Sequence, residues 1–589
     1  MKKLILLLIV ALLTACASSV TDKDVGSSKQ QVNNPKPTDK RKEESDDAVV
    51  ATEESLAPEP SETNSVLDNR TRPRKVDQIA ETEGRQLNHL VKTVAPKRMI
   101  PNATPAYEHK FQPPIQDREN YANFEDNPVK RVQEQPVSTF SIDVDTGSYA
   151  NVRRMLNQGQ IPRKDAVRLE EMVNYFNYDY PLPEGREQPF ATYTEIAPSP
   201  WNDQAHLMHI GIQGYKIAAE NRPDANLVFL VDVSGSMSSP DKLGLLKSSL
   251  KLLAKNMRAN DKISIAVYAG AAGTVLEPTS GDDKNKIISA LDSLNAGGST
   301  NGAAGIHLAY QLAEQNLVKD GINRIIIATD GDFNVGTTNF EALKELVERK
   351  RKGGVSLTTL GFGTGNYNDH LMEQLADVGN GNHAYIDSIR EANKVLINEM
   401  NSTLFTIAKD VKIQVEFNPQ TVAEYRLVGY ENRALKNEDF NNDKIDAGEI
   451  GAGHTVTAIY EVILTDANKT WMEPLRYQNN NKIGTRRSSL ASELGEIRIR
   501  YKQPDSDKST LTKWTVKKGD IIDFDETSEN FRFSAAVAAF GQLLRGGEMI
   551  GEFVFEDVLD LSRNAKGADR FGYRGEFIQL VSLADSLIE

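Results

Sequence analysis

An uninterrupted run of five apolar residues, 227–231, ends abruptly in polar side chains that carry oxygen atoms. A run of this kind is typical of a strand buried on both faces of a parallel sheet. Asp232, Ser234 and Ser236 follow at alternate positions, and a helix is expected to begin near Asp241. The pattern therefore predicts a buried strand, a loop rich in oxygen ligands and a helix, in that order.

The same alternation of strand and helix patterns continues from residue 226 to about 404 and predicts a mostly parallel sheet with helices on both faces. The expected strands are 227–231, 263–268, 324–329, 355–361 and 383–386. The expected helices are 242–256, 284–294, 303–316, 340–352, 369–376 and a segment from 389 onward. The carboxyl ends of the parallel strands should meet at one edge, where open α/β sheets bind their ligands.

Strand-like stretches precede this region, and after it the apolar residues alternate with period two, which predicts antiparallel strands. The expected strands are 190–196 and 207–212 before it, and 411–417, 425–430, 456–464, 496–501 and 511–516 after it. We therefore expect one β-sandwich into which the α/β domain is inserted. Helices are expected at 149–156, 168–176, 529–545, 553–563 and 577–587.

Three loops of the predicted sheet carry candidate metal ligands. Gly297 to Asn301, read G-G-S-T-N, precedes a helix pattern, and the buried strand pattern I-I-I-A-T ends in Asp330. With the D-x-S-x-S of 232–236, these loops resemble the metal-ion-dependent adhesion site of the von Willebrand factor A (VWA) domain, a Rossmann-like fold. The resemblance implies five site residues: Asp232, Ser234, Ser236, Thr300 and Asp330. It implies that the hydroxyls bind the ion directly or nearly so, and that one or both aspartates act through water.

Hydroxyl and carboxylate oxygens are the ligands that a hard cation such as Mg²⁺ requires, and Mn²⁺ is the alternative. A D-x-S-x-S alone is more often an ordinary strand-to-helix turn, so the two later loops are needed for this assignment. Neutral hydroxyls quench the charge of the ion poorly, so an open coordination position should attract an Asp or Glu carboxylate of a protein partner. We find no nucleophile and base near the site, and we therefore predict recognition and not catalysis.

The beginning of the chain has the pattern of a bacterial lipoprotein signal. Met1 to Lys3 is followed by the apolar run 4–13, which is too short to span a membrane, and L-T-A-C resembles a lipobox that would lipidate Cys16. Ala17 and Ser18 follow, which by the rules of that class favours an outer-membrane anchor facing the periplasm. The polar segment 17–95 is expected to be a disordered tether.

Composition adds two exclusions. The net charge of −14 argues against nucleic acid, because phosphate binding needs a basic face. Cys16 is the single cysteine, so no disulfide can support the fold after lipidation. The whole chain has 39% hydrophobic and 26% charged residues, and the part after the tether is expected to be globular. We expect an N-terminal VWA-associated domain at 96–221, the VWA domain at 222–405 and a β-rich domain with terminal helices at 406–589.

The segment F-S-I-D-V-D-T-G-S, 140–148, contains the D-T-G-S of aspartic proteases. A protease would need a second such loop to share a proton, and the sequence has none, so a structural loop or a helix start is expected here. This segment and E-E-M-V-N-Y-F-N-Y, 170–178, resemble the region before the VWA domain in a family of poorly characterised bacterial lipoproteins.

The sequence thus predicts a membrane-anchored, non-enzymatic envelope protein that binds a protein partner through a divalent metal ion. Two alternatives remain at this stage. In the first, the VWA domain recruits substrate for a hydrolase in the terminal regions. In the second, the protein is a structural envelope tether whose metal only stabilises the loops.

Overall fold

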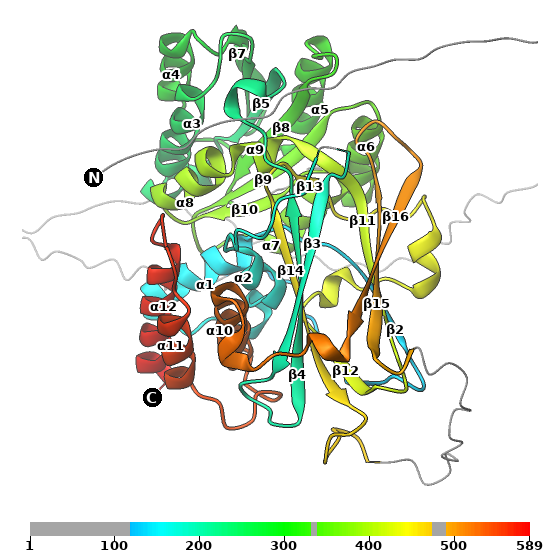
Figure 1. Ribbon diagram of the computed structural model, residues 1–589. Coiled ribbons are helices and arrows are strands. Elements are labelled where there is room, and N and C mark those ends of the chain that lie inside the picture. Colours follow the sequence, from blue (N-terminus) through cyan, green and yellow to red (C-terminus); the bar gives the residue numbers. More distant parts are fainter. Residues whose placement is uncertain (1–117, 186, 332–338, 474–489, 589) are drawn as a thin grey trace, which may run out of the picture. The chain divides into compact units, whose positions relative to one another are not determined.

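The computed structural model describes residues 118–185, 187–331, 339–473 and 490–588 (Figure 1). These residues belong to the second of two compact units, Tyr107–Glu589. The predicted signal segment, Cys16 and the tether lie outside the described residues. Within the described part, no helix has the length and apolarity needed to cross a membrane.

A six-stranded sheet forms the centre of the VWA region, in the order β10-β9-β8-β5-β6-β7. Its strands are β5 (Ala225–Asp232), β6 (Lys262–Tyr268), β7 (Ala272–Ser280), β8 (Ile322–Thr329), β9 (Ser356–Phe362) and β10 (His383–Ile386). All neighbours are parallel except β6 and β7. The predicted parallel sheet is confirmed, and the antiparallel edge strand β7 is an addition to it.

Helices cover both faces of this sheet. Leu227, Phe229 and Val231 of β5 pack with side chains of α3 (Leu245–Lys255) and α4 (Lys284–Ser293). Val228 and Leu230 point to the opposite face, toward α5 (Gly302–Gln315), α6 (Phe340–Lys352) and α7 (Asp369–Val378). The strand is therefore buried on both faces, as its uninterrupted apolar run predicted.

Two predicted helices of the VWA region differ in detail from the observed ones. The helix expected at 242–256 begins with a π-helical turn, Pro240–Gly244, and α3 itself starts at Leu245. The segment expected from residue 389 onward is divided into α8 (Ile389–Asn393), a π-helical turn (Lys394–Asn398) and α9 (Met400–Leu404).

Strands from before and after the VWA region combine in two antiparallel sheets. The first has the order β1-β12-β14-β4-β3, and in the second β2 and β13 join the path β11-β15-β16. The bounds are β1 (Lys130–Arg131), β2 (Val137–Ser141), β3 (Phe190–Pro198), β4 (Ala205–Gly214), β11 (Thr406–Phe417), β12 (Val422–Val428), β13 (Ile450–Gly451), β14 (Thr455–Leu464), β15 (Glu493–Lys502) and β16 (Ser509–Lys517). The pairs β4/β14 and β2/β11 join the two sequence regions, so the VWA region is inserted between paired strands.

One apolar core lies between these two sheets and makes them a β-sandwich. Met208, Ile210 and Ile212 of β4 belong to it, together with Ile413 of β11 and Ile497 of β15. Aromatic rings cross the same space, with the rings of Phe417 and Tyr425 stacked at 4.3 Å between centroids. The inferred sandwich is therefore confirmed.

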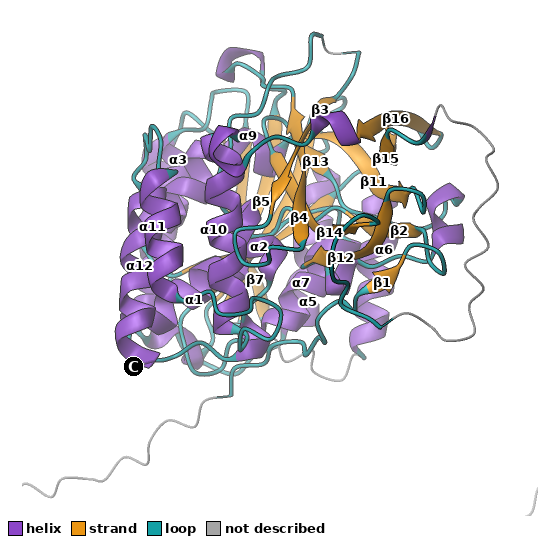
Figure 2. Ribbon diagram, turned by 60° about the horizontal axis from the view of Figure 1, so that its bottom comes forward, coloured by secondary structure: helices purple, strands orange, loops and turns teal. Residues whose placement is uncertain are grey.

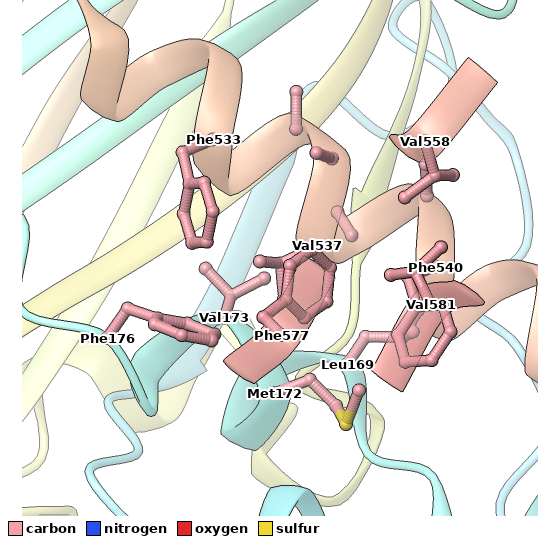
Figure 3. Close-up of a cluster of buried hydrophobic side chains, with 14 of the residues drawn as sticks. Leu169, Met172, Val173, Phe176, Phe533, Val537, Phe540, Val558, Phe577 and Val581 are labelled. Atoms are coloured by element: carbon pink, nitrogen blue, oxygen red, sulfur yellow. The ribbon is translucent and has the colours of Figure 1, made fainter. Parts of the chain in front are cut away.

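A layer of helices covers the outer face of the first sheet (Figure 2). It consists of α1 (Gly147–Asn157), α2 (Leu169–Asn174), α10 (Glu529–Leu544), α11 (Phe555–Asn564) and α12 (Tyr573–Ile588). Phe533 and Phe540 of α10 pack edge to face against Phe577 of α12, and α2 contributes Met172 to the same cluster (Figure 3). The predicted burial of α10, apolar nearly all round, is confirmed.

Candidate metal site

The D-x-S-x-S loop begins where β5 ends, with the Asp232 side chain fully buried. One carboxylate oxygen of Asp232 accepts a hydrogen bond from the Ser234 backbone N–H at 2.8 Å. The other accepts from the Thr329 hydroxyl, also at 2.8 Å. The hydroxyls of Ser234 and Ser236 lie 2.9 Å apart. These contacts fix the loop so that its oxygen atoms gather at the carboxyl edge of the sheet.

The other two predicted loops lie at the same edge. Because β5 and β8 are parallel neighbours, with Val231 opposite Ala328, the end of β8 brings Asp330 beside Asp232. Burial raises the pKa of Asp232. The hydrogen bond from the Ser234 N–H acts to lower this pKa, and the nearby Asp330 carboxylate acts to raise it. The two aspartates are therefore electrostatic neighbours.

The glycine loop before α5 contacts the D-x-S-x-S loop through its backbone. The Gly235 N–H donates to the Gly298 carbonyl at 3.0 Å, and the Gly297 N–H donates to the Val233 carbonyl at 2.8 Å. Gly298 has φ of +88°, in the left-handed region that favours glycine. Thr300, two residues further on, is half-buried. The fold thus brings the segments of all five predicted residues together. Within the described part of the chain, the Thr300 side chain makes no hydrogen bond.

Lys242 is a component of the site that the sequence reasoning missed. Its buried ammonium group lies 2.9 Å from a carboxylate oxygen of Asp330 and donates to the Asn366 side-chain oxygen at 2.7 Å. Asn366 in turn donates to Asp330 at 3.1 Å. Gly363 leaves room for this arrangement, because a Cβ atom there would lie 2.2 Å from the Lys242 Cγ atom. The sequence shows only a lysine six residues after Ser236, and a single residue at this spacing does not predict a contact with Asp330.

The donor set fits a divalent cation. The contributing side chains are carboxylates and hydroxyls, and such oxygen ligands suit Mg²⁺ or Mn²⁺. Asp232, Ser234, Ser236, Thr300 and Asp330 would hold the ion, which would supply a positive centre for an incoming carboxylate. Lys242 engages one oxygen of Asp330, so the protein itself compensates part of the negative charge of the site.

We expect the variant Lys242→Met to bind Mg²⁺ more tightly than the unchanged protein. Removing a cation next to a cation site relieves repulsion, and the expected gain in affinity is on the order of tenfold. Titration calorimetry measures it, with circular dichroism to verify the fold. Lys344→Met, which removes a lysine paired with Glu341 at the surface, is the matched control and should leave the affinity unchanged. Weaker binding by Lys242→Met would mean that the lysine orders Asp330 for the ion.

A second group of buried charges joins the D-T-G-S loop to the VWA region. Single carboxylate oxygens of Asp143, Glu171 and Glu373 lie within 4.8 Å of one another. Two arginines supply the opposing charge: Arg168 pairs with Glu171 at 3.0 Å and with Glu373, and Arg433 pairs with Asp143 at 3.0 Å and with Glu373 at 3.2 Å. We interpret this group as a structural ion network.

Asp145, the second aspartate of the D-T-G-S segment, takes part in the same network. Its carboxylate accepts from the His383 backbone N–H at 2.7 Å and pairs with Arg433 at 3.1 Å. Helix α1 begins two residues later, at Gly147. The segment is thus a structural loop and a helix start, as predicted, and its two aspartates connect the β-sandwich with the VWA region.

Two neighbouring glutamates of α2 give the folded state a dependence on pH. Burial, together with the carboxylates of Glu431 and Asp143, raises the pKa of Glu170 to about 8. Burial also raises the pKa of Glu171 to about 8, against the opposing effect of the Arg168 guanidinium. In an unfolded chain a glutamate has a pKa of about 4.3, so the folded state binds more protons between these values. The contribution of these two carboxyl groups to the free energy of unfolding therefore falls as the pH rises from about 4 to about 8.

We expect a higher melting temperature at pH 6 than at pH 8 in scanning calorimetry. Glu170→Gln, which keeps an acceptor for the Tyr430 N–H, should reduce this difference because one titrating group is gone. Glu556→Gln, at an exposed position of α11, is the control and should preserve the difference. If the melting temperature of Glu170→Gln differed between pH 6 and pH 8 by as much as that of the unchanged protein, the Glu170 carboxyl would not titrate between these pH values.

Comparison with known proteins identifies the parts of the chain. Residues 226–399 match the model of the von Willebrand factor type A domain, residues 115–209 match a model described as von Willebrand factor, and residues 402–587 match the model of the C-terminal part of the uncharacterised protein YfbK. The chain is similar to Inter alpha-trypsin inhibitor, heavy chain 4, of Mus musculus, with 30% identity over 178 residues, which cover 28% of this chain and 19% of that protein.

Among solved structures, a von Willebrand factor type A protein from Catenulispora acidiphila aligns with a TM-score of 0.37 and 13% identity, covering 68% of this chain and 91% of that one. The uncharacterised protein YfbK of Escherichia coli K12 is 48% identical over 475 residues, which are 80% of this chain and 81% of that protein. The chain therefore belongs to the YfbK family of proteins with a von Willebrand factor A domain.

Proposed function

We propose that the protein is a membrane-anchored lipoprotein of the bacterial envelope that binds a protein partner through a divalent metal ion. The observation that carries this proposal is the convergence of Asp232, Ser234, Ser236 and Asp330 at the carboxyl edge of the VWA sheet. VWA domains commonly bind a divalent metal at such a site and mediate protein–protein interaction. The partner would complete the site with an Asp or Glu carboxylate.

The hydrogen bonds that hold the two carboxylates of the site support a role in recognition. Asp232 is engaged by Ser234 and Thr329, and Asp330 by Lys242 and Asn366, so both carboxylates are fixed by the protein. The ion would then be ligated largely by neutral hydroxyls, which leaves it positive enough to attract an external carboxylate. Either Mg²⁺ or Mn²⁺ would serve, and a small hard ion with an exchangeable position is what the site requires.

The anchoring part of the proposal rests on the sequence. Lipidation of Cys16 would attach the protein to the membrane, and the residues after Cys16 favour the outer membrane with the protein facing the periplasm. The segment 17–95 would then connect the anchor with the folded part. We also propose a non-enzymatic role. Among the described residues, the hydroxyls and carboxylates of the site are hydrogen-bonded to one another and to Lys242 and Asn366.

Affinity capture from envelope extracts tests the proposal. The immobilised protein should retain a partner in the presence of Mg²⁺ and release it when EDTA is added. An excess of Mg²⁺ over EDTA should restore the capture. A partner that is retained equally with and without chelator would contradict metal-dependent recognition, and it would favour a structural envelope tether.

A further inference from the structure

A shallow groove of about 670 Å³ lies at the surface on three connections of the fold. They are the turn between β3 and β4, the segment that follows β14, and the connection between α10 and α11. The groove holds two of the three tryptophans of the chain, Trp201 and Trp471, together with Phe553. We propose that this groove, which we call the acidic aromatic groove, binds a lysine- or arginine-bearing peptide segment of another protein.

The aromatic floor of the groove is held firmly. The Trp201 indole N–H donates to the buried carboxylate of Glu461. The same carboxylate accepts a hydrogen bond of 2.9 Å from the Nε atom of Arg426. The Trp201 ring meets Phe553 edge to face, with 6.1 Å between centroids. On the other side, Glu424 accepts from the Trp471 backbone N–H at 2.7 Å. These side chains would lose little conformational freedom when a ligand binds, so the groove is preorganised.

The charge of the groove has one sign. Among the described lining residues the charged ones are all acidic: Asp203, Glu548, Glu552 and Asp557. Each is exposed, and none pairs with a basic side chain elsewhere in the described part of the chain. Asp557 also accepts from the Val554 backbone N–H at 2.9 Å, which holds its carboxylate at the start of α11. Four carboxylates around aromatic rings favour a cationic ligand, because cations bind both to carboxylates and to the face of a tryptophan ring.

A buried hydroxyl gives a second, independent indication of a ligand. Ser199 lines the groove with only 7% of its surface exposed, and its Oγ atom has no hydrogen-bond partner among the described residues. A buried hydroxyl without a partner is unfavourable unless a ligand or water satisfies it. A peptide, unlike a simple cation, carries N–H and C=O groups that can do so. The combination therefore favours a basic peptide segment over a membrane surface, since anionic lipid would be repelled by the four carboxylates.

Fluorescence anisotropy with the purified full chain tests this proposal. The probe is a fluorescein-labelled hexapeptide that alternates lysine with glycine, and the titration contains EDTA so that its result is independent of the metal site. We expect saturable binding that weakens as salt is added, because the attraction between the charges is screened. A peptide with glutamate in place of lysine should not bind.

The variant Glu548→Gln/Glu552→Gln removes two carboxylates of the groove, and we expect it to weaken binding of the lysine peptide by on the order of tenfold. Asp505→Asn/Asp507→Asn, which removes two exposed carboxylates in the turn between β15 and β16, is the matched control and should bind as the unchanged protein does. Trp471→Ala should also lose affinity, with a melting curve to verify its fold. Equal binding by the groove variant and the control would overturn the proposal, as would preferential binding of a neutral oligosaccharide such as chitotetraose.

Discussion

Asp232→Asn is expected to lose most of its affinity for Mg²⁺ while the protein stays folded. The asparagine retains the shape of the side chain and an oxygen that accepts from the Ser234 N–H, so the loop should keep its conformation. It removes the negative charge next to the hydroxyls that would ligate the ion. The expected loss of affinity is about 10- to 100-fold, the range typical of groups that orient or support metal ligands.

Titration calorimetry of Asp232→Asn with MgCl₂ measures this effect. Asp282→Asn, at an exposed position before α4, is the control and should bind Mg²⁺ as the unchanged protein does. Asp232→Ala is a less suitable variant because it leaves the Ser234 N–H and the Thr329 hydroxyl without their buried acceptor. Unchanged Mg²⁺ binding by Asp232→Asn would remove the basis of the proposed function.

Arg433→Met is expected to destabilise the fold by about 3 to 5 kcal/mol, the cost typical of leaving buried charges without their partner. Arg433 pairs with Asp143 and Asp145 of the D-T-G-S loop and with Glu373 and Asp377 of α7, at distances between 2.6 and 3.2 Å. A methionine fills similar space but leaves these carboxylates facing one another. Because each contact joins different parts of the chain, the loss cannot be relieved by movement of one loop.

Chemical denaturation with urea measures the free energy of unfolding of Arg433→Met. Arg563→Met, which removes an exposed arginine that pairs with Asp560 on α11, should change it by less than about 0.5 kcal/mol. Lowering the pH should restore part of the stability of Arg433→Met, because protonation neutralises the unpaired carboxylates. An effect of Arg433→Met no larger than that of the control would show that the network does not stabilise the fold.

The VWA sheet could be predicted because its strands are long, apolar and separated by helix patterns of clear period. Strand β7 was missed for the opposite reason: it lies at the edge of the sheet, and of its residues only Leu276 and Thr279 are buried. Such a strand carries little hydrophobic signal. The short strand β2 carries little hydrophobic signal because three of its five residues are Ser or Thr, and its partner β11 lies more than 260 residues further along the chain.

The candidate site was predictable only as far as its residues lie in local motifs. Asp232, Ser234 and Ser236 stand together in the sequence, and Asp330 ends a recognisable strand. Lys242 and Asn366 contact Asp330 from positions 88 and 36 residues away, and no periodicity connects them. Arg433 ends a short 3-10 turn, Glu431–Arg433, and its role depends on contacts that the tertiary fold alone creates.

The insertion of the VWA region has a consequence for the order of folding. Strand β4 pairs with β14, and β2 pairs with β11, so 240 or more residues of chain separate strands that must pair. The inserted region contains its own strand neighbours and can assemble early, whereas closure of the surrounding sandwich requires slow, long-range contacts. A nascent or truncated chain that stops near residue 405 would carry β4 with one unpaired edge, and such an edge is a template for aggregation.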